Sequence, residues 1–270
     1  MVKLSPQIMG IVNLTPDSFS DGGRFLDPRA AIEHAHQLIE QGADLLDLGA
    51  ESTRPGADPV RPAEELERLI PVIEGIRSGG STVPISVDTT KAAVARVALQ
   101  AGASWVNDVS ALDDPEMASV CAAAGCTLVL MHRRGTPKTM QRDTRYHDLI
   151  GEVSAFLAER VGRAVQAGIP PERIVLDPGV GFGKALHDNP TVIAMTPRLR
   201  ATGHRVLIGA SRKRFIGELT GVAEPSERVA GSIGAALAAA QLGADLLRVH
   251  DVGPTVQALR VYQTILGAQT

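Results

Sequence analysis

Eight short apolar runs, each ending in a polar residue, recur along this chain and constrain its fold more than any other feature. The runs are rich in Val, Ile and Leu, and segments with helical hydrophobic periodicity separate them. They span Ile8–Leu14, Leu45–Thr53, Pro84–Thr89, Trp105–Ala111, Thr127–His132, Ile174–Gly179, Val206–Ser211 and Leu246–Asp251. Strands that alternate with helices pair in parallel through right-handed crossovers. Eight such units in 270 residues predict an α/β fold of the (β/α)8 TIM barrel type.

The helical segments between these runs support the same architecture. Clear examples cover residues 28–43, 62–78, 91–103 and 228–244, and several end on Gly-Ala, which stops a helix before the next strand. The competing fold, an open doubly wound sheet, is expected to place a Gly-rich turn after its first strand. Here a long polar loop, TPDSFSDGGRFLD, follows instead. No linker or low-complexity segment interrupts the pattern, so we predict a single domain over residues 1–270.

Composition narrows the possible partners and location. A net charge of -3 and only 3% aromatic residues argue against a nucleic-acid interface, which is expected to be basic and to carry stacking side chains. Two cysteines, Cys121 and Cys126, cannot form a disulfide framework, and their apolar surroundings predict buried thiols. No apolar stretch reaches the roughly 18 residues of a membrane span, and no leader pattern begins the chain. We therefore expect a soluble cytoplasmic protein without a membrane segment.

The polar residues that end the predicted strands indicate where the chemistry lies. In a (β/α)8 barrel the carboxyl ends of all strands face one mouth, which holds the active site in such enzymes. The residues expected there are Asn13, Asp47, Asp88, Asn107, Asp108, Asp177, Ser211, Arg248 and His250. For Asp47, Asp108 and Ser211 the sequence leaves open a second interpretation, in which the side chain only caps a turn or helix. Asp177 needs a partner in particular, because an ionised carboxylate at the end of a buried strand is costly.

The glycine-rich stretch DPGVGFGKA after the sixth run is not a nucleotide-binding P-loop. Pro178 stands where that motif requires its first glycine, and Ala185 replaces the Ser or Thr after the lysine. Glycines at alternate positions are instead typical of a loop whose backbone approaches a ligand closely.

A phosphate site is predicted at the last two strands. The basic turn after the seventh run contains Arg212, Lys213 and Arg214, and Arg248 and His250 lie on one face at the end of the eighth. The loops after strands seven and eight form the usual phosphate site of this fold. The seven histidines form no metal-ligand cluster, but a diphosphate-bound Mg²⁺ needs few protein ligands.

Taken together in order, the chain's motifs resemble those of one enzyme family. They are GIVNLTPDSFSDGG, ESTRPGA, SVDT, NDVSA, LDPGVGFGK, SRKRFIGELTG and RVHDV, and they extend over the whole chain. The chain is similar to the dihydropteroate synthases of folate biosynthesis. That family joins 4-aminobenzoate to 6-hydroxymethyl-7,8-dihydropterin diphosphate and releases 7,8-dihydropteroate and diphosphate. The resemblance also implies a (β/α)8 barrel, a requirement for Mg²⁺, a homodimer and competition by sulfonamides at the aminobenzoate site.

Matching the motifs residue by residue implies a role for each candidate. The pterin-binding set is Asp88, Asn107, Asp177 and Lys213, with Arg248 lying against the pterin and reaching the diphosphate. Asn13, as the metal ligand, and His250 resemble the neighbours of diphosphate and Mg²⁺. The aminobenzoate surroundings are Thr53, Arg54, Pro55, Phe182 and Ser211. We expect Asp88, Asp177, Lys213 and Arg248 to be the catalytic residues.

One departure and two alternatives remain. Arg133 and Arg134 follow His132 where the family resemblance predicts a neutral pair, so the consequence of these two arginines for the site is open. A pterin-binding methyltransferase barrel would share the Asp and Asn pocket but has no reason to keep the diphosphate residues. A catalytically silent pterin-binding paralogue is the second alternative, which the intact substrate loops disfavour.

Overall fold

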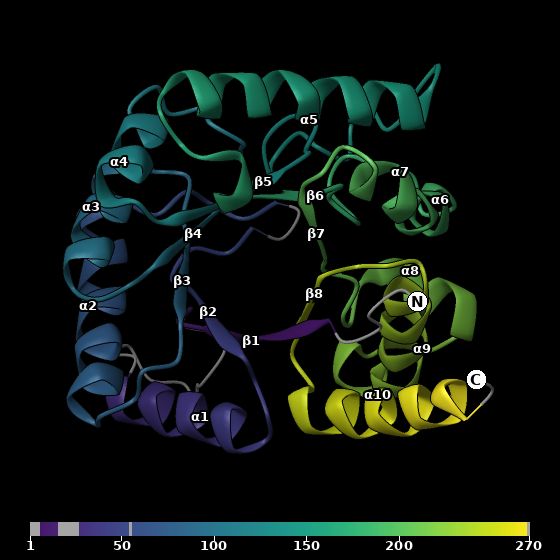
Figure 1. The fold of residues 1–270 in the computed structure, drawn as a ribbon, viewed down its shortest axis with the longest axis horizontal. Coiled ribbons are helices and arrows are strands. Elements are labelled where there is room, and N and C mark those ends of the chain that lie inside the picture. Colours follow the sequence, from purple (N-terminus) through teal and green to yellow (C-terminus); the bar gives the residue numbers. More distant parts are fainter. Residues whose placement is uncertain (1–5, 16–26, 54–55, 269–270) are drawn as a thin grey trace.

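The computed structural model describes residues 6–15, 27–53 and 56–268 and confirms the predicted barrel. Eight parallel strands form a closed ring in which β1 pairs with both β2 and β8 (Figure 1). The strands are β1 (Gln7–Asn13), β2 (Leu45–Gly49), β3 (Ile85–Asp88), β4 (Trp105–Asp108), β5 (Thr127–Met131), β6 (Ile174–Asp177), β7 (Arg205–Ile208) and β8 (Leu246–Val249). Most strands end a few residues before the predicted runs do, so Thr53 and Ser211 lie in loops rather than in strands.

Helices surround the ring and cover its outer surface, as Figure 1 shows. They are α1 (Pro28–Glu40), α2 (Pro62–Ser78), α3 (Ala92–Gln100), α4 (Met117–Ala124), α5 (Leu149–Gln166), α6 (Asp188–Ala194), α7 (Thr196–Arg200), α8 (Arg214–Thr220), α9 (Val229–Gln241) and α10 (Val252–Gly267). The predicted helix stops are confirmed, because the glycines that follow α1, α3, α4 and α9 all have positive φ. A residue with a side chain would strain this turn before the next strand.

Two apolar layers hold the barrel together. The larger one lies between the helices and the outward faces of the strands, and the smaller one fills the barrel interior. The interior cluster is Met9, Leu45, Trp105, Val129, Val175, Leu207 and Leu246. Leu45, Trp105 and Leu246 are the first residues of their strands, and the polar side chains that point inward follow these apolar ones along the strands, so the amino end of the barrel is packed and the opposite end is left for polar groups.

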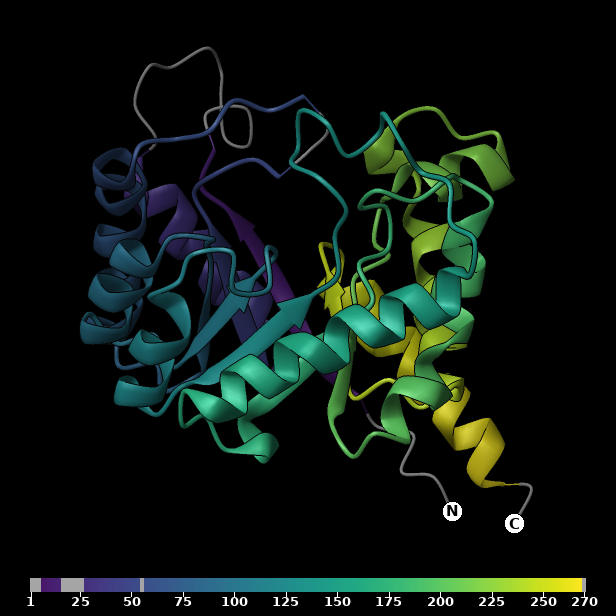
Figure 2. The ribbon, with the colours of Figure 1, turned by 90° about the horizontal axis from the view of Figure 1, so that it is seen from above.

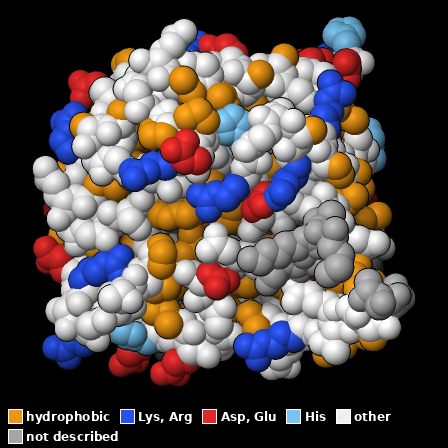
Figure 3. Space-filling view, viewed as in Figure 1, with side chains coloured by type: hydrophobic (Ala, Val, Ile, Leu, Met, Phe, Trp, Pro, Cys, Tyr) orange, Lys and Arg blue, Asp and Glu red, His pale blue; other side chains and the backbone are white. Residues whose placement is uncertain are grey.

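The two ends of the barrel therefore differ in character. Figure 3 views the amino ends of the strands, where apolar side chains gather near the centre between charged ones. The guanidinium of Arg205 lies over the Trp105 ring there, 4.9 Å from its centroid. At the opposite end the described loops after β2 and β5 rise side by side (Figure 2), and the Gly56 N–H donates to the Pro137 carbonyl (3.0 Å).

The remaining composition-based expectations concern cysteines and membranes. Both Cys121 and Cys126 are free and buried, as predicted. Among the residues that the structure describes, no helix combines the length and apolar character that crossing a bilayer requires.

Candidate active site at the carboxyl end of the barrel

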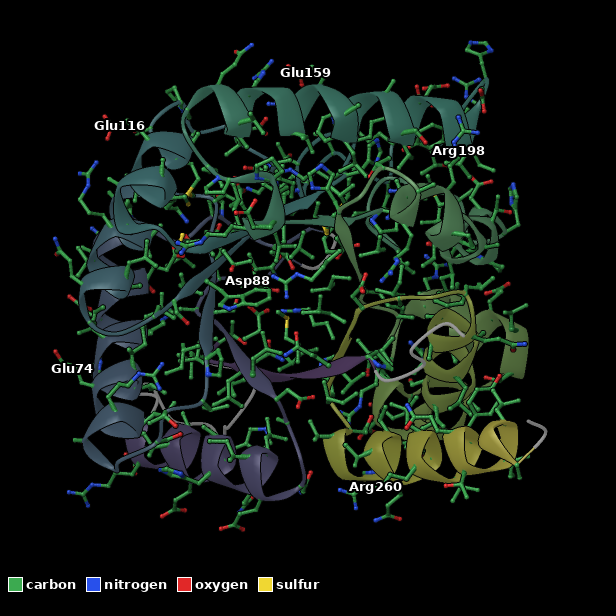
Figure 4. All side chains as sticks on the ribbon, viewed as in Figure 1. Glu74, Asp88, Glu116, Glu159, Arg198 and Arg260 are labelled. Atoms are coloured by element: carbon green, nitrogen blue, oxygen red, sulfur yellow. The ribbon has the colours of Figure 1, made fainter. Side chains whose placement is uncertain are left out.

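Strand alternation brings the predicted polar residues into the barrel interior. Successive side chains of a strand point to opposite faces, so a residue two positions after an interior apolar residue also points inward. On four strands an inward polar residue therefore follows two positions after an interior apolar one. The pairs are Leu45 and Asp47, Trp105 and Asn107, Val175 and Asp177, and Leu246 and Arg248. The polar residues form the layer above the apolar interior, at the mouth of the barrel. In Figure 4, Asp88 lies inside the ring of strands, whereas Glu74 and Arg260 lie on the outer rim.

The guanidinium of Arg248 connects three strands across this layer. Its Nε donates to Oδ2 of Asp47 (2.6 Å) and its terminal nitrogen donates to Oδ2 of Asp88 (2.9 Å). Burial lowers the pKa of Arg248, but the two carboxylates outweigh burial and raise it above its ordinary value. Burial raises the pKa of Asp88 to about 8, and Arg248 opposes that rise. The arginine is therefore fixed in position before any ligand arrives.

Asn107 has a defined amide orientation and an unused acceptor. Its Nδ2 donates to Oδ2 of Asp47 (3.1 Å), and the carboxylate partner requires the nitrogen on that side. Its Oδ1 is buried and has no hydrogen-bond partner among the described residues. A buried acceptor without a donor is costly, so this atom indicates that a ligand donates a hydrogen bond here.

Asp177 is 5% exposed, and the loop after β6 orients its carboxylate. The Gly179 N–H donates to its Oδ1 (2.7 Å). Burial raises the pKa of Asp177, and the bond from Gly179 and the charge of Lys213 oppose the rise without cancelling it. The carboxylate is thus short of donors in the protein alone.

Lys213 approaches the same space from the turn after β7. Its Nζ donates to the Val180 carbonyl (2.7 Å) and lies 4.1 Å from the centroid of the Phe182 ring. Burial lowers its pKa to about 8, although Asp177 acts to raise it. The cleft therefore presents an ammonium donor close to two oxygen acceptors, on Asp177 and Asn107.

Gly179 is the position in the loop after β6 that most needs glycine. Its φ is +72°, and a Cβ there would lie 1.8 Å from the His132 carbonyl oxygen. The loop can follow this path only because no side chain is present, which explains part of the glycine-rich pattern.

Seven of the predicted site residues line one cleft at the mouth. They are Thr53, Asp88, Asn107, Asp177, Phe182, Lys213 and Arg248. A larger adjoining cavity of about 260 Å³ shares Thr53, Asp88 and Val109 with this cleft and extends beneath the loops after β2 and β5.

The other predicted residues either lie around this cleft or fall outside the residues that the structure describes. Ser211 and His250 contact each other at the ends of β7 and β8, with 3.1 Å between the Ser211 hydroxyl and His250 Nδ1. Asn13 is half-buried at the end of β1, level with Gly49. Arg54 and Pro55 lie outside the described residues.

The structure gives different roles to Asp47 and Asp108, the two aspartates whose roles the sequence left open. Asp108 caps a turn: it accepts from the N–H groups of Ser110 (2.8 Å) and Leu112 (2.7 Å) and stabilises a positive φ at Leu112. Asp47 instead holds Arg248 and Asn107 at the mouth, where the sequence placed it without assigning it a role in substrate binding. Its position two residues after the interior residue Leu45 was the available sequence signal.

Lys91, Glu51 and Glu65 form a second group that was not predicted. The Lys91 ammonium donates to Oε2 of the buried Glu65 (2.7 Å) and also to Glu51. Burial raises the pKa of Glu65, and the bond from Lys91 opposes this. Because Glu51 precedes Ser52 and Thr53, the group ties the start of the loop after β2 to α2 and α3.

The unexpected arginines after β5 interact with the chain itself. Arg133 pairs with Asp113 (3.2 Å) and also lines the adjoining cavity. Arg134 pairs with Glu152 on α5 (2.6 Å) and lies over the Tyr146 ring, 3.9 Å from its centroid. Arg134 therefore fastens the loop after β5 to the helix that follows.

Comparisons with known proteins agree with this geometry. The family model described as "Pterin binding enzyme" matches residues 9–250. A Synechocystis protein named dihydropteroate synthase is 48% identical over 255 residues, which cover 94% of this chain and 88% of that relative. A Xanthomonas albilineans dihydropteroate synthase structure with 4-aminobenzoic acid is 51% identical with a TM-score of 0.91, and it covers 97% of this chain and 93% of that one. A structure from the same organism in complex with 7,8-dihydropteroate has a TM-score of 0.87 at 48% identity, over 97% and 94% of the two chains. With these similarities over nearly its full length, and with the polar cleft at its mouth, the chain belongs to the dihydropteroate synthase family of pterin-binding enzymes.

Proposed function

We propose that this cleft binds 6-hydroxymethyl-7,8-dihydropterin diphosphate and that the chain condenses it with 4-aminobenzoate to give 7,8-dihydropteroate and diphosphate. The observation that carries the proposal is the set of polar groups at the mouth. The Oδ1 of Asn107 has no donor among the described residues, the Asp177 carboxylate accepts from the Gly179 N–H, and Lys213 lines the same cleft as a donor. A related Xanthomonas structure holds 4-aminobenzoic acid and another holds 7,8-dihydropteroate, which are a substrate and a product of this reaction.

Ring recognition follows from the complementary edges. A pterin presents a ring N–H and a 2-amino group side by side, and a carboxylate accepts from both. Asp177 takes this edge, Asn107 accepts from a neighbouring donor, and Lys213 donates to the pterin carbonyl. The bond to Asn107 satisfies an acceptor that has no donor among the described residues of the protein alone.

The reaction needs stabilisation of opposite charges at two places. The bond between the exocyclic carbon and the diphosphate oxygen breaks, and its electron pair leaves with the diphosphate. The carboxylates of Asp88 and Asp177 stabilise the positive charge that develops on the dihydropterin, while Arg248 stabilises the departing anion. The free arylamine then forms the carbon–nitrogen bond and loses a proton, which requires no strong side-chain base.

Mg²⁺ is part of the proposal as a companion of the diphosphate. Among the described residues no group of three His, Cys, Asp or Glu side chains could enclose a metal ion. Asn13 at the end of β1 offers one amide oxygen, which suits a cation that takes most of its oxygen ligands from phosphate and water. Bound there, Mg²⁺ would supply charge neutralisation to the leaving group.

A coupled assay for diphosphate release tests the function. The chain with both substrates and Mg²⁺ is expected to release one diphosphate for each 7,8-dihydropteroate formed. Pterin binding without release would instead favour the silent paralogue, and methyl transfer from methyltetrahydrofolate to a corrinoid would favour the methyltransferase barrel.

Pterin affinity is expected to fall as the pH rises through about 8. Because burial lowers the pKa of Lys213 to about 8, the free protein loses this proton in that range. The complex keeps the proton, since the ammonium donates to the ligand, so binding takes up a proton above pH 8. Affinity then falls by up to about tenfold per pH unit. Calorimetry from pH 6.5 to 9.5 measures this, and Lys213→Arg, which stays charged, should flatten the profile. An equally flat profile in the unmodified chain would contradict the assignment.

His250→Ala is expected to weaken binding of the diphosphate substrate more than binding of a pterin without phosphates. If His250 contacts the diphosphate, its loss should reduce affinity for the pterin diphosphate by about tenfold, as for one hydrogen bond to a charged group. A pterin that lacks phosphates should bind within twofold of its original affinity. Parallel titrations of the two ligands measure this, and equal losses for both would remove His250 from the diphosphate site.

The proposal also includes a cytoplasmic homodimer that acts on small molecules. The family resemblance supports the homodimer, and the composition supports the cytoplasmic location. Analytical ultracentrifugation at several concentrations tests the assembly, and a monomer at all concentrations would contradict it.

A further inference from the structure

Lys184 is a buried cation that has no assigned role in the reaction. It lies in the loop after β6 and its side chain is among the largest that are fully buried, with the residue 2% exposed. Within the described part of the chain, no carboxylate forms an ion pair with it. Burial lowers the pKa of Lys184 to about 7, although the charge of Asp177 acts to raise it, so holding an ammonium here is costly and its position calls for an explanation.

The ammonium is fully occupied by three good acceptors. Its Nζ donates to the carbonyls of Gly179 (2.8 Å) and Phe182 (3.0 Å) and to Nδ1 of His132 (2.9 Å). An ammonium has three protons, so these bonds satisfy it completely. Two of the acceptors lie in its own loop and the third follows β5, so Lys184 joins two loops at the mouth.

His132 is suited to accept this bond. Burial lowers its pKa to about 2, with the charges of Lys184 and Arg134 acting in the same direction. In the neutral tautomer that carries its proton on Nε2, Nδ1 is the acceptor for the Lys184 ammonium, and we assign this tautomer to His132. The ring is held in turn by an edge contact with Phe156, with 4.9 Å between centroids.

The loop that Lys184 holds positions three parts of the pterin cleft. Its Gly179 N–H orients the Asp177 carboxylate, and its Val180 carbonyl receives the Lys213 ammonium. Its Phe182 ring lies beneath the same ammonium. The two carbonyls that Lys184 binds flank Val180 and Gly181, so the lysine closes the turn from which these contacts are made.

Other groups confirm that the path of this loop is set by side-chain donors. The Gly181 carbonyl accepts from Gln141 (3.3 Å) and the Gly183 carbonyl accepts from Tyr146 (2.8 Å). Lys184 binds two of the five consecutive carbonyls from residue 179 to residue 183, more than any other donor side chain. Removing it would leave both carbonyls and the His132 nitrogen without this donor.

We propose that Lys184 is a positioning residue for pterin binding, whose buried ammonium, anchored on His132, fixes the loop after β6 so that Asp177 and Lys213 meet the pterin edge. The inference rests on the proposed pterin function. Lys184 acts through Asp177 and Lys213 and does not touch the substrate itself.

A double-mutant cycle with Asp177 tests this directly. Lys184→Met keeps the chain length and removes the donor, and it is expected to weaken binding of the pterin diphosphate about tenfold without aminobenzoate present. In an Asp177→Asn background the same change should cost clearly less, about threefold, because one of the two groups through which it acts is already impaired. Equal losses in both backgrounds, or affinity equal to that of the unmodified chain, would overturn the proposal.

Steady-state kinetics separate positioning from general loss of structure. The KM for pterin diphosphate should rise about tenfold in Lys184→Met while kcat changes less than threefold. Arg198→Met is the control, because this arginine is exposed on α7 at the outer edge of the barrel (Figure 4), and its KM should not change. A fall in kcat at constant KM would show loss of active protein instead and would overturn the proposal.

A gentler variant covers the case in which Lys184→Met does not fold. Lys184→Gln keeps two N–H donors, so we expect an intermediate loss of affinity that is again smaller in the Asp177→Asn background. Affinity equal to that of the unmodified chain would overturn the proposal. Binding is measured here without turnover. A chain that binds pterin but releases no diphosphate would contradict the proposed function, whereas the binding losses in the double-mutant cycle would still test the role of Lys184.

Discussion

Asp177→Asn is expected to weaken binding of the pterin diphosphate by about 2–4 kcal/mol, which is about 30- to 900-fold in Kd. The amide keeps the shape of the side chain and the acceptor for the Gly179 N–H, but it turns an NH₂ group toward the donors of the pterin. Two donors then face each other in a buried cleft where the carboxylate had accepted both. Isothermal titration with the pterin diphosphate measures the loss.

The same substitution is expected to leave the fold intact or to stabilise it. Burial raises the pKa of Asp177, so ionisation of this group opposes folding at neutral pH, and a neutral amide removes that cost. Weak binding together with an unchanged or higher midpoint of urea denaturation would therefore identify a recognition residue. Asp143→Asn, at an exposed carboxylate in the loop after β5, is the control and should alter neither property. Near-original pterin affinity in Asp177→Asn would remove Asp177 from the pocket.

Arg248→Met is expected to lower the free energy of unfolding by about 3–5 kcal/mol. The guanidinium is the hydrogen-bonded ion-pair partner of Asp47, which is fully buried, and of Asp88, which is almost so. Methionine fills much of the same volume but leaves two carboxylates close together without a cation. Urea denaturation followed by circular dichroism measures the change.

The pH dependence and two further variants make this prediction specific. Burial already raises the pKa of Asp88 to about 8 against the charge of Arg248, so without the arginine this pKa rises further and the folded state binds more protons than the unfolded state at intermediate pH. Stability of Arg248→Met should therefore fall as the pH increases from 5 to 8. Adding Asp47→Asn should recover part of the loss, since one buried charge is gone. Arg260→Met, at an exposed arginine on α10, is the control and should cost less than about 0.5 kcal/mol. A similar loss in both arginine variants would contradict the buried ion-pair interpretation.

The barrel could be predicted from the sequence because its signals are local. The length of each apolar run, the helical periodicity between runs and the glycines after α1, α3, α4 and α9 act within a few residues of the chain. The inward direction of Asn107, Asp177 and Arg248 also follows locally, since it depends only on the two-residue period of a strand. The order of the motifs along the chain then carried the family resemblance, which the comparisons confirm.

The loops limited the prediction of the site. Thr53 and Phe182 line the cleft, but Ser211 contacts His250 beside it, and nothing in a loop sequence fixes such distances. The consequence of Arg133 and Arg134 could not be predicted because their partners, Asp113 and Glu152, are about twenty residues away along the chain.

Only the tertiary structure decided which buried polar groups meet. Asp47 and Asp108 are both aspartates at or near strand ends, yet one binds Arg248, 201 residues away, and the other caps its own turn. The same holds for Lys184 and His132, 52 residues apart, whose contact nothing in either local motif predicts. Sequence determines which face of a strand a side chain occupies, because that direction follows from backbone geometry. Which polar side chain pairs with which depends on how the eight strands align around the closed barrel. It also depends on the free-energy cost of burying an unpaired polar group, which arises only when the chain folds.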